Sequence, residues 1–458
     1  MNGEDIKRNK ILIITYVFPP AAYVGVYRTL KYCKYLREQG WDPLVLTIRP
    51  AGITYRNEAL SREIPSDVPV YRTFNIDPAN WLEKRSRRKG KASGTATKNE
   101  TSCSQAPALM PGIWMRLKGL LIKLLTDSPD SHVFWLPFAF FTGLRILLTE
   151  KIDVIYSTSP PHSSHIVGFL LAKCFRKPYV LDFRDPWYVT GSIQRPNKKL
   201  SWVLKWETCM KRAFVRKAAR VIGASRGEMV ELREEFPEIT AEHFAFITNG
   251  YDPADFSGII HSSKPRSKLT LTHAGTIYGG TAGEFFGALK QLGTEYPEVA
   301  GDIHVQLLGE IADEYLELIR LLERQGIVQN YGLQPHAMAL QMVMESDVLV
   351  VLLGGDIFSA SEIPAKVFEY LFAGKVIFAI ARDGELAEIV QQSGLGIVVS
   401  PGSTDKVVQA LRNLHVDFVA GRLARAPNQS YIRSFERAAL TEKLATILDE
   451  VKRAHRDL

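Results

Sequence analysis

Short apolar runs alternate with stretches of helical periodicity along almost the whole chain. In the first half, the apolar runs predict strands at residues 10–18, 43–48, 69–74, 153–159, 179–183, 220–225 and 243–250. In the second half, they predict strands at residues 269–275, 303–309, 328–332, 347–354, 376–381 and 396–400. Strands separated by helices are typical of parallel sheets. The pattern therefore predicts an α/β fold built from two Rossmann-like domains.

Polar and turn-forming residues divide the chain. A linker pattern at 257–267 separates a predicted first domain over residues 1–256 from a second over residues 268–425. Within the first domain, residues 84–107 are basic, polar and poor in apolar groups. Such a segment cannot bury enough apolar surface to order itself, so we predict a mobile insertion there.

Two apolar stretches follow the insertion. Residues 112–126 place their apolar side chains on one face, which arginine and lysine flank. This is the pattern of an amphipathic helix at a membrane surface, and it is equally the pattern of a core helix with basic edges. Residues 135–148 are apolar on more sides, and we expect them to be buried.

Length and charge narrow the class of protein. A chain of 458 residues predicts two domains or slightly more. The formal net charge of +8 is compatible with nucleic acid, an anionic membrane surface or an anionic substrate as a partner. Much of the excess falls in residues 84–98, which contain no aromatic residues, and no nucleic-acid-binding module accompanies them. We therefore expect no nucleic-acid partner.

Cysteine usage and hydropathy bear on location. The four cysteines show neither metal-ligand spacing nor a disulfide framework, which favours a reducing cytosol. The first apolar run is too short for the core of a signal peptide. No apolar run reaches the ~18 residues of a membrane-spanning helix. The sequence thus predicts a cytoplasmic protein.

The most informative segment is residues 359–374, which follow the predicted strand 347–354 and enter a helix that starts near Ala365. Ligands of open α/β sheets bind at this edge, and the free N–H groups of a helix start suit a phosphate. Lys366 adds a cation in the first turn. Glu369 lies on the same helical face, and its carboxylate suits a ribose diol. An amphipathic helix with ordinary surface charges is the alternative.

This segment resembles the donor-binding signature of family 4 glycosyltransferases of the GT-B class, in the motif Ile363-Pro364-x-Lys366-x-x-Glu369-Tyr370-x-x-x-Gly374. The resemblance covers nearly the whole chain apart from residues 84–107. It implies the GT-B fold, in which two Rossmann-like domains with parallel sheets face a central cleft and the second domain holds most of the donor. It also implies that a C-terminal helix within residues 430–458 returns to the first domain.

Further donor-binding residues follow from the resemblance. Gly25 and Arg28 match a family element in which a glycine lets the backbone approach the donor diphosphate, and Gly275 and Thr276 match the phosphate loop of the second domain. From the residues alone, Gly25 is equally a plain turn and Arg28 a solvated helix face. Glu362 is placed to reach the sugar, and a solvated loop carboxylate is an equal interpretation.

Catalytic candidates lie after two strands of the first domain. His162 follows the predicted strand 153–159, and Arg184 and Asp185 follow the strand 179–183. Many members of the resembled family place a histidine near the second of these positions, close to the transferred sugar. We predict that these three residues act on the acceptor and the sugar. An exposed histidine in a capping loop and an Asp–Arg structural pair are the alternatives.

The predicted activity is transfer of a sugar from a nucleoside-diphosphate sugar to an acceptor hydroxyl, with retention of configuration as the resemblance implies. No cluster has catalytic-metal spacing, and lysine and helix dipoles can neutralise the leaving diphosphate. We therefore expect no metal and no cofactor besides the co-substrate.

The basic amphipathic segment 112–126 favours a lipid-linked acceptor, with a saccharide as the other candidate, at the inner face of the plasma membrane. By analogy the pathway is bacterial exopolysaccharide, lipopolysaccharide or capsule assembly. Two alternatives stay open. One is a nucleotide-sugar epimerase of the same fold. The other is a non-catalytic scaffold, because Ser361 and Gly279–Thr281 replace charged residues of the family pattern.

Overall fold

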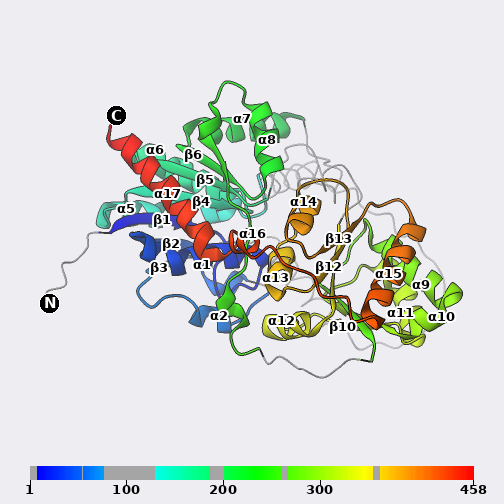
Figure 1. Ribbon diagram of the computed structural model, residues 1–458. Helices are drawn as coiled ribbons and strands as arrows, with labels where there is room; N and C mark the ends of the chain where they lie inside the picture. Colours follow the sequence, from blue (N-terminus) through cyan, green and yellow to red (C-terminus); the bar gives the residue numbers. More distant parts are fainter. Residues whose placement is uncertain are drawn as a thin grey trace, which may run out of the picture. The chain divides into compact units, whose positions relative to one another are not determined.

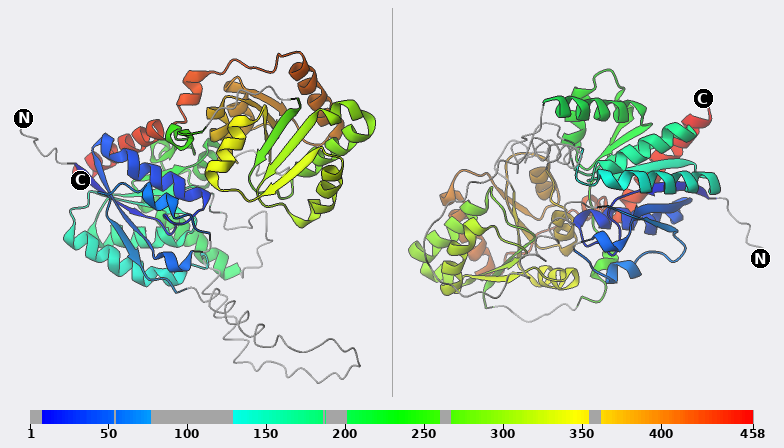
Figure 2. Two further views of the ribbon diagram at one scale, coloured as in Figure 1. Left: turned by 90° about the horizontal axis from the view of Figure 1, so that it is seen from below. Right: turned by 180° about the vertical axis from the view of Figure 1, so that it is seen from behind.

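The computed structural model describes residues 8–53, 55–76, 129–185, 187, 201–259, 267–353 and 362–457. The predicted segments 84–107 and 112–126 and Ser361 lie outside these residues. The chain divides into two compact units (Figures 1 and 2). The first unit comprises residues 1–223, 237–245 and 444–458, and the second comprises residues 224–236 and 246–443.

The first unit is built on a seven-stranded sheet with the order β3-β2-β1-β4-β5-β6-β7. Its strands are β1 (Asn9–Ile14), β2 (Trp41–Ile48), β3 (Val70–Thr73), β4 (Val154–Ser159), β5 (Tyr179–Phe183), β6 (Arg220–Gly223) and β7 (Phe244–Phe246). Neighbouring strands from β3 to β6 pair in parallel. The central strands are buried on both faces, as parallel strands between helical layers must be.

Helices cover both faces of this sheet. They are α1 (Val24–Tyr35), α2 (Ala59–Arg62), α5 (Leu136–Thr149), α6 (Ser163–Phe175) and α7 (Ser201–Lys217). The left view of Figure 2 shows α5 and α6, in cyan, on one side of the sheet and α1, in blue, on the other. Short 3₁₀ turns lie at Leu36–Gln39, Pro50–Gly52, Val133–Trp135 and Ala241–His243.

Helix α5 departs from its prediction. We expected residues 135–148 to be buried, yet Phe141 and Leu148 are 66% and 71% exposed. The helix buries only the face that carries Gly143 and Ile146, against α6 and the sheet. The prediction was wrong because an apolar composition on every side does not provide neighbours for every side.

The amino-terminal edge of the first sheet is covered by helix α17 (Arg437–Arg456). Asp449 accepts a hydrogen bond from the indole of Trp41 at 3.0 Å, and Lys452 forms an ion pair with Asp153 at 2.8 Å. Both partners stand at the start of a strand or just before one. The carboxyl edge, where ligands bind in such sheets, is the opposite one.

The second unit is built on a six-stranded sheet with the order β10-β9-β8-β11-β12-β13. Every neighbouring pair is parallel. The strands are β8 (Leu269–Ala274), β9 (Ile303–Leu308), β10 (Val328–Gly332), β11 (Val348–Leu352), β12 (Val376–Ile380) and β13 (Gly396–Val399). The α/β prediction is thus confirmed in both units.

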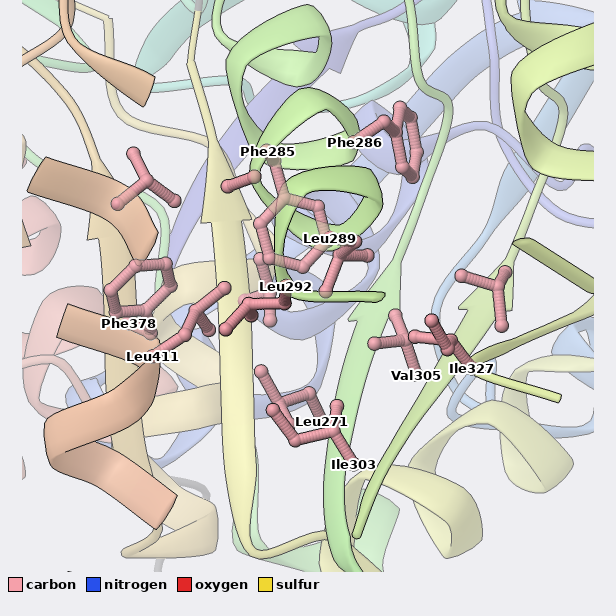
Figure 3. Close-up of a cluster of buried hydrophobic side chains, with 14 of the residues drawn as sticks. Leu271, Phe285, Phe286, Leu289, Leu292, Ile303, Val305, Ile327, Phe378 and Leu411 are labelled. Carbon is pink, nitrogen blue, oxygen red and sulfur yellow. The ribbon is translucent and has the colours of Figure 1, made fainter. Parts of the chain in front are cut away.

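Two helical layers enclose the second sheet. The helices of this unit are α8 (Arg226–Glu235), α9 (Ala282–Glu295), α10 (Pro297–Gly301), α11 (Asp313–Arg324), α12 (His336–Glu345), α13 (Lys366–Ala373), α14 (Glu385–Gln392), α15 (Thr404–Val419) and α16 (Gln429–Arg433), with a 3₁₀ turn at Pro253–Phe256. Figure 3 shows Phe285 and Leu289 of α9 against Leu271 and Phe378 of the sheet. A second apolar cluster packs α13 and α14 on the same sheet.

No helix among the described residues is both long enough and apolar enough to cross a membrane.

Candidate active site

The second unit gathers predicted donor-binding residues around the start of α13. The helix begins at Lys366, directly after its N-cap residue Ala365, so the predicted helix start is confirmed. The ammonium nitrogen of Lys366 lies 3.0 Å from Nε2 of His273. Nδ1 of the same imidazole lies 3.0 Å from the carbonyl oxygen of Val350. Because a carbonyl only accepts, Nδ1 carries the hydrogen, and Nε2 accepts from Lys366.

Gly275 forms the turn that follows β8, and the structure brings it against Lys366. Its φ is +129°, a conformation that favours glycine. A Cβ built at this position would lie 2.9 Å from Nζ of Lys366. The N–H of Gly275 donates to the carbonyl of Leu308 at 2.6 Å, which fixes the turn to β9. The backbone conformation therefore favours glycine, and its small size leaves room for the lysine.

The pKa of Lys366 lies near neutral pH. Burial lowers the pKa of Lys366 to about 7, although the charges of Glu369 and Glu362 raise it. The lysine is partly exposed as a whole, but its ammonium lies against the buried imidazole of His273. Burial and the charge of Lys366 hold the pKa of His273 well below its ordinary value. The imidazole is therefore neutral, and an anion would favour the protonated lysine.

Glu369 lies in the first turn of α13 and has a histidine partner. Its Oε1 lies 3.0 Å from Nε2 of His336, the first residue of α12. A carboxylate has two oxygens, so this contact is compatible with a second partner such as a ribose hydroxyl. Glu362 and Thr276 are exposed. The roles of these residues in donor binding stay predictions.

Arg28 of the first unit is buried, with 1% of its surface exposed, and the alternative of a solvated helix face was wrong. Its Nη2 and Nε donate to the two oxygens of Asp182 at 2.8 and 3.2 Å. The hydroxyls of Tyr156 and Thr158 donate to the same carboxylate at 2.6 and 2.8 Å. Burial acts to lower the pKa of Arg28, but the charge and hydrogen bonds of Asp182, together with Tyr32 and Tyr156, raise it well above its ordinary value. The guanidinium is a structural cation here, and its contact with a donor stays a prediction.

Gly25 and Arg184 are brought together at the start of α1. A Cβ built on Gly25 would lie 0.9 Å from Nη1 of Arg184, so the guanidinium occupies the space that a side chain would need. Gly25 is the second residue of α1 and not part of a turn, and its role in donor binding stays a prediction. Asp185 is 63% exposed, and its Oδ2 lies 3.7 Å from Nη2 of Arg184, which is longer than a hydrogen bond. The Asp–Arg pair is a loose one.

His162 is the N-cap residue of α6, and its ring stacks on Trp187 with centroids 4.5 Å apart and planes 7° apart. The helix start is capped from elsewhere in the chain. Asp130 accepts hydrogen bonds from the N–H of Ser163 at 2.8 Å and from its hydroxyl at 2.6 Å. His165 is fully buried within α6, as a structural residue would be. The stacking on Trp187 therefore orients His162.

The three parent strands β1, β4 and β5 are consecutive in the first sheet. Gly25, His162 and Arg184 follow these strands in the chain, so they share the carboxyl edge of the sheet. The catalytic candidates of the first unit therefore lie at this edge. Their chemical roles stay predictions.

Three residues that shape these sites escaped the sequence reasoning, namely His273, His336 and Asp130. His273 carried a signal, because it interrupts the apolar pattern of a strand two residues before the Gly275 turn. His336 and Asp130 carried none, since each lies 33 residues from the partner that it contacts. Within the described ranges, no group of three histidine, cysteine or acidic residues could hold a metal ion.

Comparisons with known proteins agree with this architecture. Residues 107–250 match the family described as Glycosyl transferase 4-like domain. No curated protein matches the chain. Among solved structures, Anabaena HepE in complex with UDP and glucose is 15% identical, with a TM-score of 0.59 over 96% of this chain and 100% of that chain.

Two further structures show the same likeness. Sucrose-phosphate synthase from Thermosynechococcus elongatus is 14% identical, with a TM-score of 0.62 over 98% of this chain and all of that one. A glycosyltransferase from Rickettsia africae is 14% identical, with a TM-score of 0.57 over 97% and 98% of the two chains. These structures show that the chain has the GT-B fold, and the match over residues 107–250 is to a glycosyltransferase domain.

Proposed function

We propose that this protein transfers a sugar from a nucleoside-diphosphate sugar to an acceptor hydroxyl. The observation that carries the proposal is the approach of Lys366 to the Gly275 turn at the start of α13. An ammonium group, a glycine turn and the positive end of a helix dipole together suit a diphosphate. The UDP in the neighbouring HepE structure supports a nucleotide-sugar donor.

The proposed chemistry divides between the two units. In the second, Lys366 and the helix start stabilise the negative charge that grows on the leaving diphosphate, and Glu369 binds the ribose. In the first, His162, Arg184 and Asp185 act on the acceptor and the sugar. The Trp187 stack and the Gly25 contact support defined orientations for His162 and Arg184. We propose that configuration is retained, in keeping with the family that the motif resembles.

The test of the donor site is a binding panel. UDP-, GDP-, ADP- and dTDP-sugars are added to the wild type and to Glu369→Gln. Thermal stabilisation of the protein and release of the nucleoside diphosphate are measured. We expect one nucleotide to stabilise the wild type selectively, and Glu369→Gln to bind it about tenfold more weakly, the cost of one lost hydrogen bond to a charged group. Glu317→Gln, at an exposed site on α11, is the control and should bind as the wild type does.

Three results of this panel would contradict the proposal in different ways. No stabilisation by any nucleotide would remove the donor site and favour a scaffold. Interconversion of the free nucleotide sugar without an acceptor would favour an epimerase. Equal binding by Glu369→Gln would leave the activity in place but reject the ribose role of Glu369.

We further propose that the acceptor is lipid-linked and that the protein acts on the cytoplasmic face of the plasma membrane, in bacterial surface polysaccharide assembly. The amphipathic sequence pattern of residues 112–126 supports this proposal. Leu120→Glu combined with Leu124→Glu places two charges on its apolar face, and we expect the double variant to lose co-sedimentation with anionic vesicles. Lys118→Gln with Lys123→Gln, which keeps that face, should weaken co-sedimentation less. Unchanged co-sedimentation of the Leu variant would reject the surface role.

A further inference from the structure

The contact between Lys366 and His273 has a geometry that burial alone does not require. The parallel pairing of β8 with β11 ends at Thr272 and Leu349. Directly beyond it, the imidazole of His273 donates from Nδ1 to the carbonyl of Val350 at 3.0 Å. This bond fixes both the ring and its tautomer, and it turns Nε2 toward Lys366, whose ammonium lies 3.0 Å away.

Among the residues that the structure describes, no carboxylate forms a direct ion pair with Lys366. His273 on β8 is neutral and accepts a hydrogen bond from the lysine. Glu369 on α13 and Glu362 in the preceding loop contribute attraction through space, and Glu369 is in direct contact with His336 of α12. The hydroxyl of Tyr370 accepts a hydrogen bond from the N–H of Ala274. Burial raises the pKa of this hydroxyl, so Tyr370 is neutral. Within the described part of the chain, the imidazole is therefore the hydrogen-bond partner of the ammonium.

We propose that His273 is a positioning residue for the donor, which holds the Lys366 amine beside the Gly275 turn, and that binding of a nucleoside-diphosphate sugar adds a proton to Lys366. The proposal rests on the donor site proposed above. The proton comes from solvent, at most one for each site, and no other bond forms or breaks. A neutral acceptor suits this task, because a carboxylate in place of His273 would compete with the diphosphate for the ammonium.

The direction of the effect follows from the charges. Burial lowers the pKa of Lys366 to about 7 in the free protein. A bound diphosphate raises it, because an opposite charge nearby favours the protonated form. Below pH 7 the lysine is already protonated and binding takes up little. Above pH 7 binding must protonate it first, so affinity falls as pH rises until the pKa of the complex is reached.

The test uses the full-length protein and the nucleotide sugar that stabilises it best in the panel of four. A sugar-esterified diphosphate has no phosphate proton that titrates near neutral pH, so a proton taken up belongs to the protein. Calorimetric titration at pH 8 in two buffers of different ionisation enthalpy should show uptake approaching one proton, and at pH 6 nearly none. Between pH 7 and 8.5 the dissociation constant should rise by up to about tenfold per unit.

Variants separate positioning from mere stability. His273→Leu should weaken binding about tenfold at pH 7.5, the loss of one hydrogen bond to a charged group, and should move the onset of uptake below pH 7. His273→Gln, which returns an acceptor oxygen, should recover part of both. Thr272→Val is the control, because Thr272 is equally buried on the same strand, and its hydroxyl bonds with Gln306 and Ser346 on the other face. It should bind with the wild-type pH profile.

Each outcome supports or overturns either the inference or the proposed function. If a nucleotide sugar binds the wild type without proton uptake, the inference is overturned while the proposed function stands. If none of the four binds, the proposed function fails, and the inference with it. A wild-type pH profile in a folded His273→Leu protein would overturn the positioning role. If that variant does not fold, the wild-type uptake and its loss in Lys366→Met decide the question.

Discussion

Replacing Lys366 with methionine should lower kcat/KM for sugar transfer by about 100- to 1,000-fold, the usual loss when one charge-stabilising donor is removed from an active site. The reason is local. In the second unit, Lys366 is the cation that lies against the Gly275 turn and at the start of α13. Methionine keeps the length and apolar stem of the lysine. Initial rates with the nucleotide sugar found in the binding panel give the measurement.

Stability should not follow activity in this variant. A buried amine costs free energy, while its loss leaves Nε2 of His273 without the hydrogen bond from Lys366. These effects oppose each other, so we expect the free energy of unfolding to change by less than about 2 kcal/mol. Lys290→Met, at an exposed site on α9, is the matched control and should keep wild-type activity. Activity of Lys366→Met within threefold of the wild type would reject the role of the lysine.

The second large effect is on the stability of the first unit. Arg28→Met should cost about 3–5 kcal/mol, because it leaves the carboxylate of Asp182 buried without its cation. Tyr156 and Thr158 would still donate to Asp182 but carry no charge. Scanning calorimetry should show a transition lowered by roughly 6–20 °C.

Two variants test this account of Arg28. Arg216→Met breaks an ion pair with Glu238 in which both side chains are about half exposed, and it should cost less than about 1 kcal/mol. Arg28→Met combined with Asp182→Leu removes both buried charges and should be more stable than Arg28→Met alone. If Arg28→Met is as stable as Arg216→Met, or if the double variant is less stable than Arg28→Met, the Arg28–Asp182 ion pair does not stabilise the first unit as proposed.

The fold was predictable because apolar runs and turn residues report burial along a short stretch of chain. Every predicted strand corresponds to a strand of the structure. The error at the end of the first strand shows what such runs do not report. Residues 10–18 were predicted as one strand, but β1 ends at Ile14, and Tyr16 and Phe18 are buried in the loop that follows. An apolar residue therefore indicates that its side chain is buried. It does not indicate that its backbone pairs with a neighbouring strand.

The candidate site was predictable in its positions and less so in its contacts. The start of α13 at Lys366 follows from a strand, a proline and an amphipathic run within about twenty residues. The glycines at 25 and 275 were marked by the loops predicted there. What each one accommodates, the Arg184 guanidinium or the Lys366 ammonium, was not visible in the pattern.

The sequence by itself determined the alternation of strands and helices, the loops that end at the carboxyl edges, and the residue types offered there. These depend on neighbours within a few positions of one another. Tertiary structure alone decided which charges are paired inside and which face a ligand. Arg28 meets Asp182 across 154 residues and Lys366 meets His273 across 93, and no local pattern encodes either distance. The same residue type became a structural cation in one unit and a poised amine in the other, because burial and the partner set the free energy of a charge.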